Sequence, residues 1–74
     1  MSIKPQTEGR HLIGGLLKKR REGLKLSVEE LAENVGLSPS SISRIENGKF
    51  SATIDTLLAI SKELKCKINF VTFE

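Results

Sequence analysis

Two short amphipathic helices with a tight turn between them are predicted near the middle of the chain. Over residues 27–36 the apolar side chains fall on one face at helical spacing, at Val28, Leu31, Ala32 and Val35. Over residues 38–47, Ile42 and Ile45 are the only large apolar side chains. Each helix is therefore expected to bury one stripe against a common core, and the second presents a wide polar face.

Residues that start and stop helices fall at both ends of these patterns. Ser27, followed three residues later by Glu30, predicts a reciprocal capping box. Ser38, followed at once by Pro39, predicts an N-cap with proline in the first helical position, where its missing N–H costs nothing. Glycine-based stop signals follow the two helices, at Gly36 and at Asn47-Gly48.

Two further helices are predicted on either side, after an N-terminal tail of residues 1–9. One runs from Arg10 to Gly23, and its expected buried side chains are Ile13, Leu16 and Leu17. The other starts at a Thr53 cap and ends near Leu64, and its inner stripe is formed by Leu57, Leu58, Ile60 or Ser61, and Leu64.

The C-terminal segment 66–74 alternates in a β-like pattern. Ile68 and Phe70 fall on one side and Val71 and Phe73 on the other. A lone strand leaves its backbone groups without partners, and no second strand is evident in the sequence. The prediction is a C-terminal β-strand that pairs with the same strand of another copy, so that these four residues form a dimer interface. The alternative is a tail that packs back on its own domain.

Composition and charge limit the class of protein that this chain can be. A chain of 74 residues forms one small domain, and its single cysteine excludes an internal disulfide, which fits a cytoplasmic protein. No apolar run reaches membrane-spanning length. The net charge is only +3, but residues 10–25 hold six basic residues against one acidic residue. Such a helix suits phosphate contact, with Lys18 and Arg20 as candidates, although a solvated helix face is the alternative.

The polar face of the second helix carries the candidate chemistry. Its outward side chains are three serines and an arginine, Ser40, Ser41, Ser43 and Arg44. A helix with such short side chains can lie in the major groove of DNA, which is about 12 Å wide, where hydroxyl and guanidinium groups donate to phosphates or base edges. Serines that simply solvate a surface helix are the alternative.

The same stretch closely resembles the helix-turn-helix of the lambda-repressor-like, or XRE, family. The shared residues are Leu31-Ala32, Gly36-Leu37-Ser38 and the run from Ile42 to Gly48, ISRIENG. The resemblance extends from about Ile13 to Leu64. It implies a mainly α fold, a compact domain of four to five helices over residues 10–65, and the docking of the second motif helix in a major groove.

The resemblance also assigns roles to individual residues. It implies base contacts from Pro39, Ser40, Ser41 and Arg44, and phosphate contacts from Ser38, Ser43, Asn47 and Lys49. It further implies a partly buried ion pair between Arg21 and Glu46 that joins the first helix to the DNA-reading helix. Similar C-terminal strands occur in XRE proteins that resemble antitoxins.

The predicted function is a dimeric, sequence-specific transcriptional regulator, most simply a repressor that occupies an inverted-repeat operator in double-stranded DNA. The alternative is an antitoxin that binds a protein toxin and regulates its own operon. An enzyme is not expected, because the serines lack a base: His11 is the only histidine. The sequence offers no metal-ligand cluster, and no cofactor is predicted.

Overall fold

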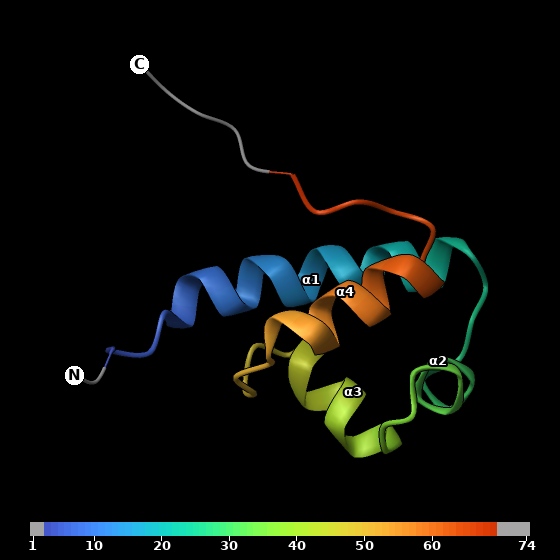
Figure 1. Cartoon of the computed structure of the whole chain (residues 1–74), viewed down its shortest axis with the longest axis horizontal. Helices are drawn as coiled ribbons and strands as arrows, with labels where there is room; N and C mark the ends of the chain where they lie inside the picture. The colour runs from blue at the N-terminus through green and yellow to red at the C-terminus, as the bar shows by residue number, and fades with distance from the viewer. Residues whose placement is uncertain (1–2, 70–74) are drawn as a thin grey trace.

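Four helices in chain order account for the regular structure of residues 3–69, the part of the chain that the computed structural model describes. They are α1 (Thr7–Gly23), α2 (Val28–Val35), α3 (Pro39–Glu46) and α4 (Ile54–Glu63). Figure 1 shows α1 and α4 along the upper part of the domain, with α3 at its lower edge and residues 66–69 on the opposite side, above α1. None of these helices combines the length and the apolar character needed to cross a membrane.

The helix starts confirm the predicted caps. The Glu30 backbone N–H donates to Ser27 Oγ at 3.0 Å, and the Ser27 N–H donates back to Glu30 Oε1 at 3.1 Å. Thr53 Oγ1 accepts the Thr56 N–H at 3.1 Å in the same way. These bonds satisfy backbone donors that the first helical turn leaves free. Helix α1 begins at Thr7, three residues before the predicted start at Arg10.

All four helices end in the same type of turn, closed by one residue in the left-handed conformation. These residues are Lys25 (φ 59°), Gly36 (φ 78°), Gly48 (φ 71°) and Lys65 (φ 56°). In each turn the next residue's N–H donates to a carbonyl five residues earlier, as when the Lys49 N–H donates to the Arg44 carbonyl at 2.8 Å. This is the Schellman arrangement, which normally favours glycine. Gly36 and Gly48 predicted two of these helix ends, whereas nothing in the sequence indicated that Lys25 takes this conformation.

The core consists of apolar side chains from α2, α3 and the C-terminal half of α4. Its buried members are Leu31, Ala32, Ile42, Ile45, Ile60 and Leu64. The prediction that Ile13 and Leu16 are buried is wrong, since 47% and 59% of their surfaces are exposed, and Leu58 is half exposed.

Helix α1 turns inward a stripe that shares only Leu17 with the one predicted. Gly14 and Arg21 are buried, and Leu17 and Leu24 pack against the core. These four positions share a face at helical spacing. A glycine and an arginine occupy half of this stripe, so the apolar pattern pointed to the neighbouring face instead.

The predicted C-terminal strand is not supported. Residues 66–69 form neither strand nor helix, and no strand occurs elsewhere in residues 3–69. A strand needs a neighbour that accepts and donates backbone hydrogen bonds, and this part of the chain provides none. The predicted interface residues Phe70, Val71 and Phe73 lie outside the described residues, and Ile68 is 48% exposed.

Candidate nucleic-acid interface

Helix α3 is divided into a buried side and an exposed side. Ile42 and Ile45 enter the core with 1% and 5% of their surfaces exposed. Three of the four predicted base-contacting residues, Pro39, Ser40 and Arg44, are exposed, while Ser41 is half-buried. Because the isoleucines fix the rotation of α3, the polar face is held in one orientation.

The hydroxyls at the start of α3 form a connected cluster. Ser38 Oγ accepts the Ser41 N–H at 3.2 Å, donates to Ser41 Oγ at 2.9 Å and lies 3.3 Å from Ser40 Oγ. The cap therefore uses the Ser38 hydroxyl, which was predicted to hold a phosphate. The cluster remains at the surface, so a DNA group can replace the hydroxyl–hydroxyl bonds.

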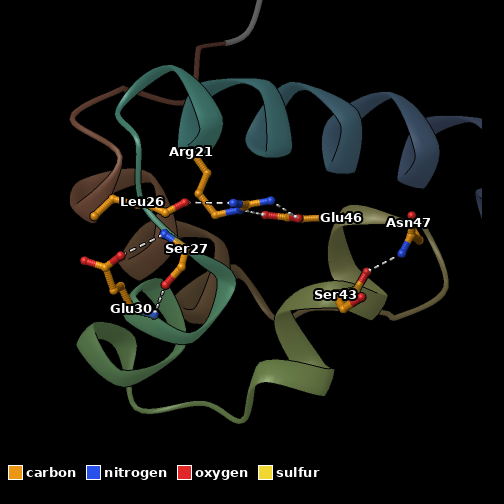
Figure 2. A network of polar contacts seen from close by, with 7 residues as sticks. All are labelled: Arg21, Leu26, Ser27, Glu30, Ser43, Glu46 and Asn47. Carbon is orange, nitrogen blue, oxygen red and sulfur yellow. Dashed lines mark hydrogen bonds and ion pairs between the residues drawn. The ribbon is translucent and has the colours of Figure 1, made fainter.

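The other predicted phosphate residues near α3 lie at its C-terminal end. Asn47 donates one amide proton from Nδ2 to the Ser43 carbonyl at 2.9 Å, which closes the end of the helix (Figure 2). The second amide proton of Asn47 takes no part in this bond. Lys49 is exposed just beyond, and Ser43 is half-buried.

An ion pair between Arg21 and Glu46 fixes α3 to α1, as the resemblance implied. Arg21 Nε donates to Glu46 Oε2 at 2.7 Å and Nη2 donates to Oε1 at 3.1 Å, while Nη1 donates to the Leu26 carbonyl at 2.8 Å (Figure 2). The two side chains expose 9% and 5% of their surfaces. The hydrogen bond to Glu46 raises the pKa of the Arg21 guanidinium, against the opposing effect of burial.

The basic residues of α1 are not all available to a polyanion. Arg21 is neutralised by Glu46, and Arg20 lies at the end of α4, where its Nε donates to the Leu64 carbonyl at 2.8 Å and Nη2 to the Lys65 carbonyl at 3.3 Å. Positive groups stabilise the C-terminal end of a helix in this way. Lys18, the other candidate on this helix, is exposed.

Two close approaches join α1 to the end of α3. A Cβ at Gly14 would lie 2.7 Å from the Glu46 carbonyl oxygen, so only glycine allows this spacing of the helices. A Cβ at Gly48 would lie 2.9 Å from the backbone and ring of His11. His11 is exposed, and it packs over this turn.

Arg44 also has a neighbour that the sequence did not suggest. Its guanidinium carbon lies 5.4 Å from the ring centroid of Phe50, within the range of a cation–π interaction. Phe50 is in the connection between α3 and α4. The six-residue separation crosses a turn, so helical periodicity could not have paired the two side chains.

A second feature of the surface is an apolar groove between α1 and α4, with a volume of about 700 Å³. Leu16, Ile54 and Leu58 line it and expose 59%, 75% and 50% of their surfaces. Ile68 extends the groove along the segment that follows α4. In residues 3–69 no group of three or more histidine, cysteine or acidic side chains could hold a metal ion.

Comparison with known proteins identifies a helix-turn-helix model, HTH_3, that matches residues 17–71. The chain is 46% identical over 44 residues to an uncharacterized HTH-type transcriptional regulator of Bacillus subtilis (strain 168), YozG; the match covers 58% of this chain and 52% of that protein. The chain thus spans about half the length of this curated relative.

Two solved structures share the arrangement of helices. The clp gene regulator ClgR of Corynebacterium glutamicum is 26% identical, with a TM-score of 0.75, over 77% of this chain and 61% of that one. An HTH_3 family transcriptional regulator from Vibrio cholerae is 31% identical, also with a TM-score of 0.75, over 82% of this chain and 34% of that one.

Proposed function

The chain belongs to the helix-turn-helix family HTH_3, and we propose that it is a sequence-specific DNA-binding transcriptional regulator that reads the major groove with α3. The observation that carries the proposal is the division of α3. Its isoleucines are buried in the core, whereas Pro39, Ser40 and Arg44 on the other side are exposed. Similarity to regulators from three bacteria supports this function.

Arg44 is the proposed base-reading residue, because a guanidinium can donate two parallel hydrogen bonds to O6 and N7 of guanine. Such a contact contributes about 1–3 kcal/mol of discrimination. Pro39, Ser40 and Ser41 lie on the same helix and contact neighbouring base edges. Phosphate contacts come from the ends of α3 and from α1, at Ser38, Ser43, Asn47, Lys49 and Lys18. Arg20, the remaining candidate, is held instead by the carbonyls of Leu64 and Lys65 at the end of α4.

The proposed active form is a homodimer on an inverted-repeat operator, with two α3 helices in major grooves about 34 Å apart. The apolar groove supports this proposal, since Leu16, Ile54 and Leu58 expose much of their surfaces to water and Ile68 lies in line with them. The simplest regulation is repression by occupancy, in the cytoplasm where the DNA lies. No enzymatic activity is proposed.

Selection of bound duplexes from a random pool at moderate salt tests the DNA-reading proposal. We expect enrichment of an inverted repeat, and Arg44→Ala should relax one position in each half-site. Lys62→Ala, at an exposed lysine of α4, removes the same charge and is the control that should leave the selected sequence unchanged. Enrichment of no sequence by the wild type would refute the proposal.

The dimer is tested separately, by light scattering of the purified protein at tens of micromolar. Leu16→Glu should yield monomers that keep their helical content, whereas Lys19→Glu, at an exposed residue of the same helix that does not line the groove, should remain dimeric. A monomeric wild type would exclude this dimer. An apolar face of this kind also suits a protein partner, and co-purification with the product of a neighbouring gene tests the antitoxin alternative.

A further inference from the structure

The Arg44 guanidinium is supported by an aromatic ring. Arg44 lies in the last turn of α3 and is exposed, and its guanidinium carbon is 5.4 Å from the centroid of the Phe50 ring. An arginine at the surface normally samples many rotamers. A ring at this distance favours those in which the guanidinium stays over it.

The turn that ends α3 brings the ring to this place. Gly48 takes the left-handed conformation, and the Lys49 N–H donates to the carbonyl of Arg44 itself at 2.8 Å. The chain therefore reverses over the last turn of α3, and Phe50 returns beside Arg44. Gly48 is buried against His11, which leaves no room for a side chain there.

The ring itself is anchored. Phe50 is half-buried and packs against the hydrophobic core, so the core holds the ring in place. The ring that supports Arg44 is consequently part of the packed domain rather than a second mobile surface group. Arg44 can then be ordered by Phe50 at little additional entropic cost to the ring.

Contact with an aromatic ring leaves the hydrogen-bonding edge of a guanidinium free. The five N–H donors of arginine point outward in the plane of the group, while the planar face is what stacks on an aromatic ring. A bidentate contact with guanine uses that edge and requires its orientation to be fixed. Stacking and base reading are therefore compatible for Arg44.

We propose that Phe50 is a positioning residue that holds Arg44 in the orientation needed to read its base pair, and so contributes to sequence specificity without touching DNA. The proposal rests on the proposed function of α3. Loss of the ring leaves Arg44 present but less ordered. Discrimination then weakens at the one base pair that Arg44 reads, and the other positions of the half-site are unaffected.

The test compares Phe50→Leu, which keeps an apolar side chain, with Phe50→Tyr, which keeps the ring. Affinity is measured for the selected operator and for the operator changed only at the position that Arg44→Ala relaxes. Phe50→Leu should reduce the ratio of the two affinities about two- to fivefold, the range of a cation–π interaction at an exposed site, whereas Phe50→Tyr should retain it. In the Arg44→Ala background, Phe50→Leu should change the ratio no further.

A purely structural role for Phe50 predicts a different result. It would lower the stability and the affinity for both operators together, and leave their ratio at the wild-type value. An unchanged ratio for Phe50→Leu, or a ratio that rises, would overturn the inference even if the wild type selects a clear operator. A wild type that selects no sequence would instead refute the proposed function, and the inference would fall with it.

A measurement without DNA tests the contact itself. Protons of the Arg44 side chain over the Phe50 face should be shifted upfield in the proton NMR spectrum by the ring current. The shift should persist in Phe50→Tyr and disappear in Phe50→Leu, with circular dichroism showing that both variants are folded. Identical Arg44 shifts in the wild type and Phe50→Leu would show that the two side chains do not stack in solution.

Discussion

The Arg21–Glu46 ion pair gives the sharpest test of how this domain is held together. Arg21→Met removes the charge but keeps a long apolar side chain. It leaves the Glu46 carboxylate, only 5% exposed, without its two donors. Glu46 is also the last residue of α3, where the partial negative charge of the helix end disfavours a second negative charge.

The expected cost is large relative to the stability of the whole domain. Breaking a buried pair on one side costs about 3–5 kcal/mol. A chain of this length has a total free energy of unfolding of about 4–11 kcal/mol. With a urea dependence of about 1 kcal/mol per molar for a small protein, the unfolding midpoint should fall by about 3 M or more.

Urea unfolding followed by far-ultraviolet circular dichroism is the suitable assay, because the chain has no tryptophan or tyrosine to report by fluorescence. Glu46→Leu should cost less than Arg21→Met, since a long arginine side chain can reach solvent and Nη1 keeps the Leu26 carbonyl. The double variant Arg21→Met, Glu46→Leu should recover most of the loss, because neither charge then remains buried.

Two results would refute this reasoning. A fall in midpoint of less than about 1 M for Arg21→Met would show that the pair is not buried in solution, since exposed pairs contribute about 0–1 kcal/mol. A double variant as unstable as Arg21→Met would show that the loss comes from packing rather than from the unpaired carboxylate.

The pH dependence of the stability that the pair contributes follows from the raised pKa of Arg21. Its stabilisation is complete below the ordinary arginine pKa and is lost only as the pH rises through the higher folded value, so this group gives no change across neutral pH.

Three further predictions concern the helix contacts and helix ends. Gly14→Ala should lower the free energy of unfolding, measured in urea, by about 1–3 kcal/mol, because its Cβ would meet the backbone of α3. Gly15→Ala, whose Cβ would have nothing within 4 Å, should raise the free energy of unfolding by up to about 1 kcal/mol. Equal effects of the two changes would contradict the close packing at Gly14. Lys65→Gly should raise the thermal midpoint by relieving about 1 kcal/mol of left-handed strain, while Lys67→Gly should not, and a loss at Lys65 would refute the strain argument. Thr53→Ala should cost about 1 kcal/mol by removing the cap of α4, and no loss in thermal unfolding would show that the Thr53 hydroxyl contributes nothing.

The sequence by itself determined the local features of the motif. Helix starts depend on residues close in the chain, so the capping box of Ser27 and Glu30 and the cap of Thr53 could be predicted without any tertiary contact. The same holds for Gly36, whose left-handed turn is a backbone property. The resemblance to the XRE family added Arg21 and Glu46, which lie 25 residues apart, and the structure brings them together.

Tertiary structure decided which faces meet. The inward face of α1 contains Gly14 and Arg21, whose burial depends on the carbonyls of α3 and on the Glu46 carboxylate, so the apolar pattern pointed to Ile13 and Leu16 instead. The contact of Arg44 with Phe50 depends on the reversal of the chain at Gly48. Arg20 donates to the Leu64 carbonyl at the end of α4, which is 44 residues away in the chain. Short-range patterns report hydrogen bonds and periodicity within a helix, whereas these contacts depend on where a second helix ends, and only the folded arrangement fixes that.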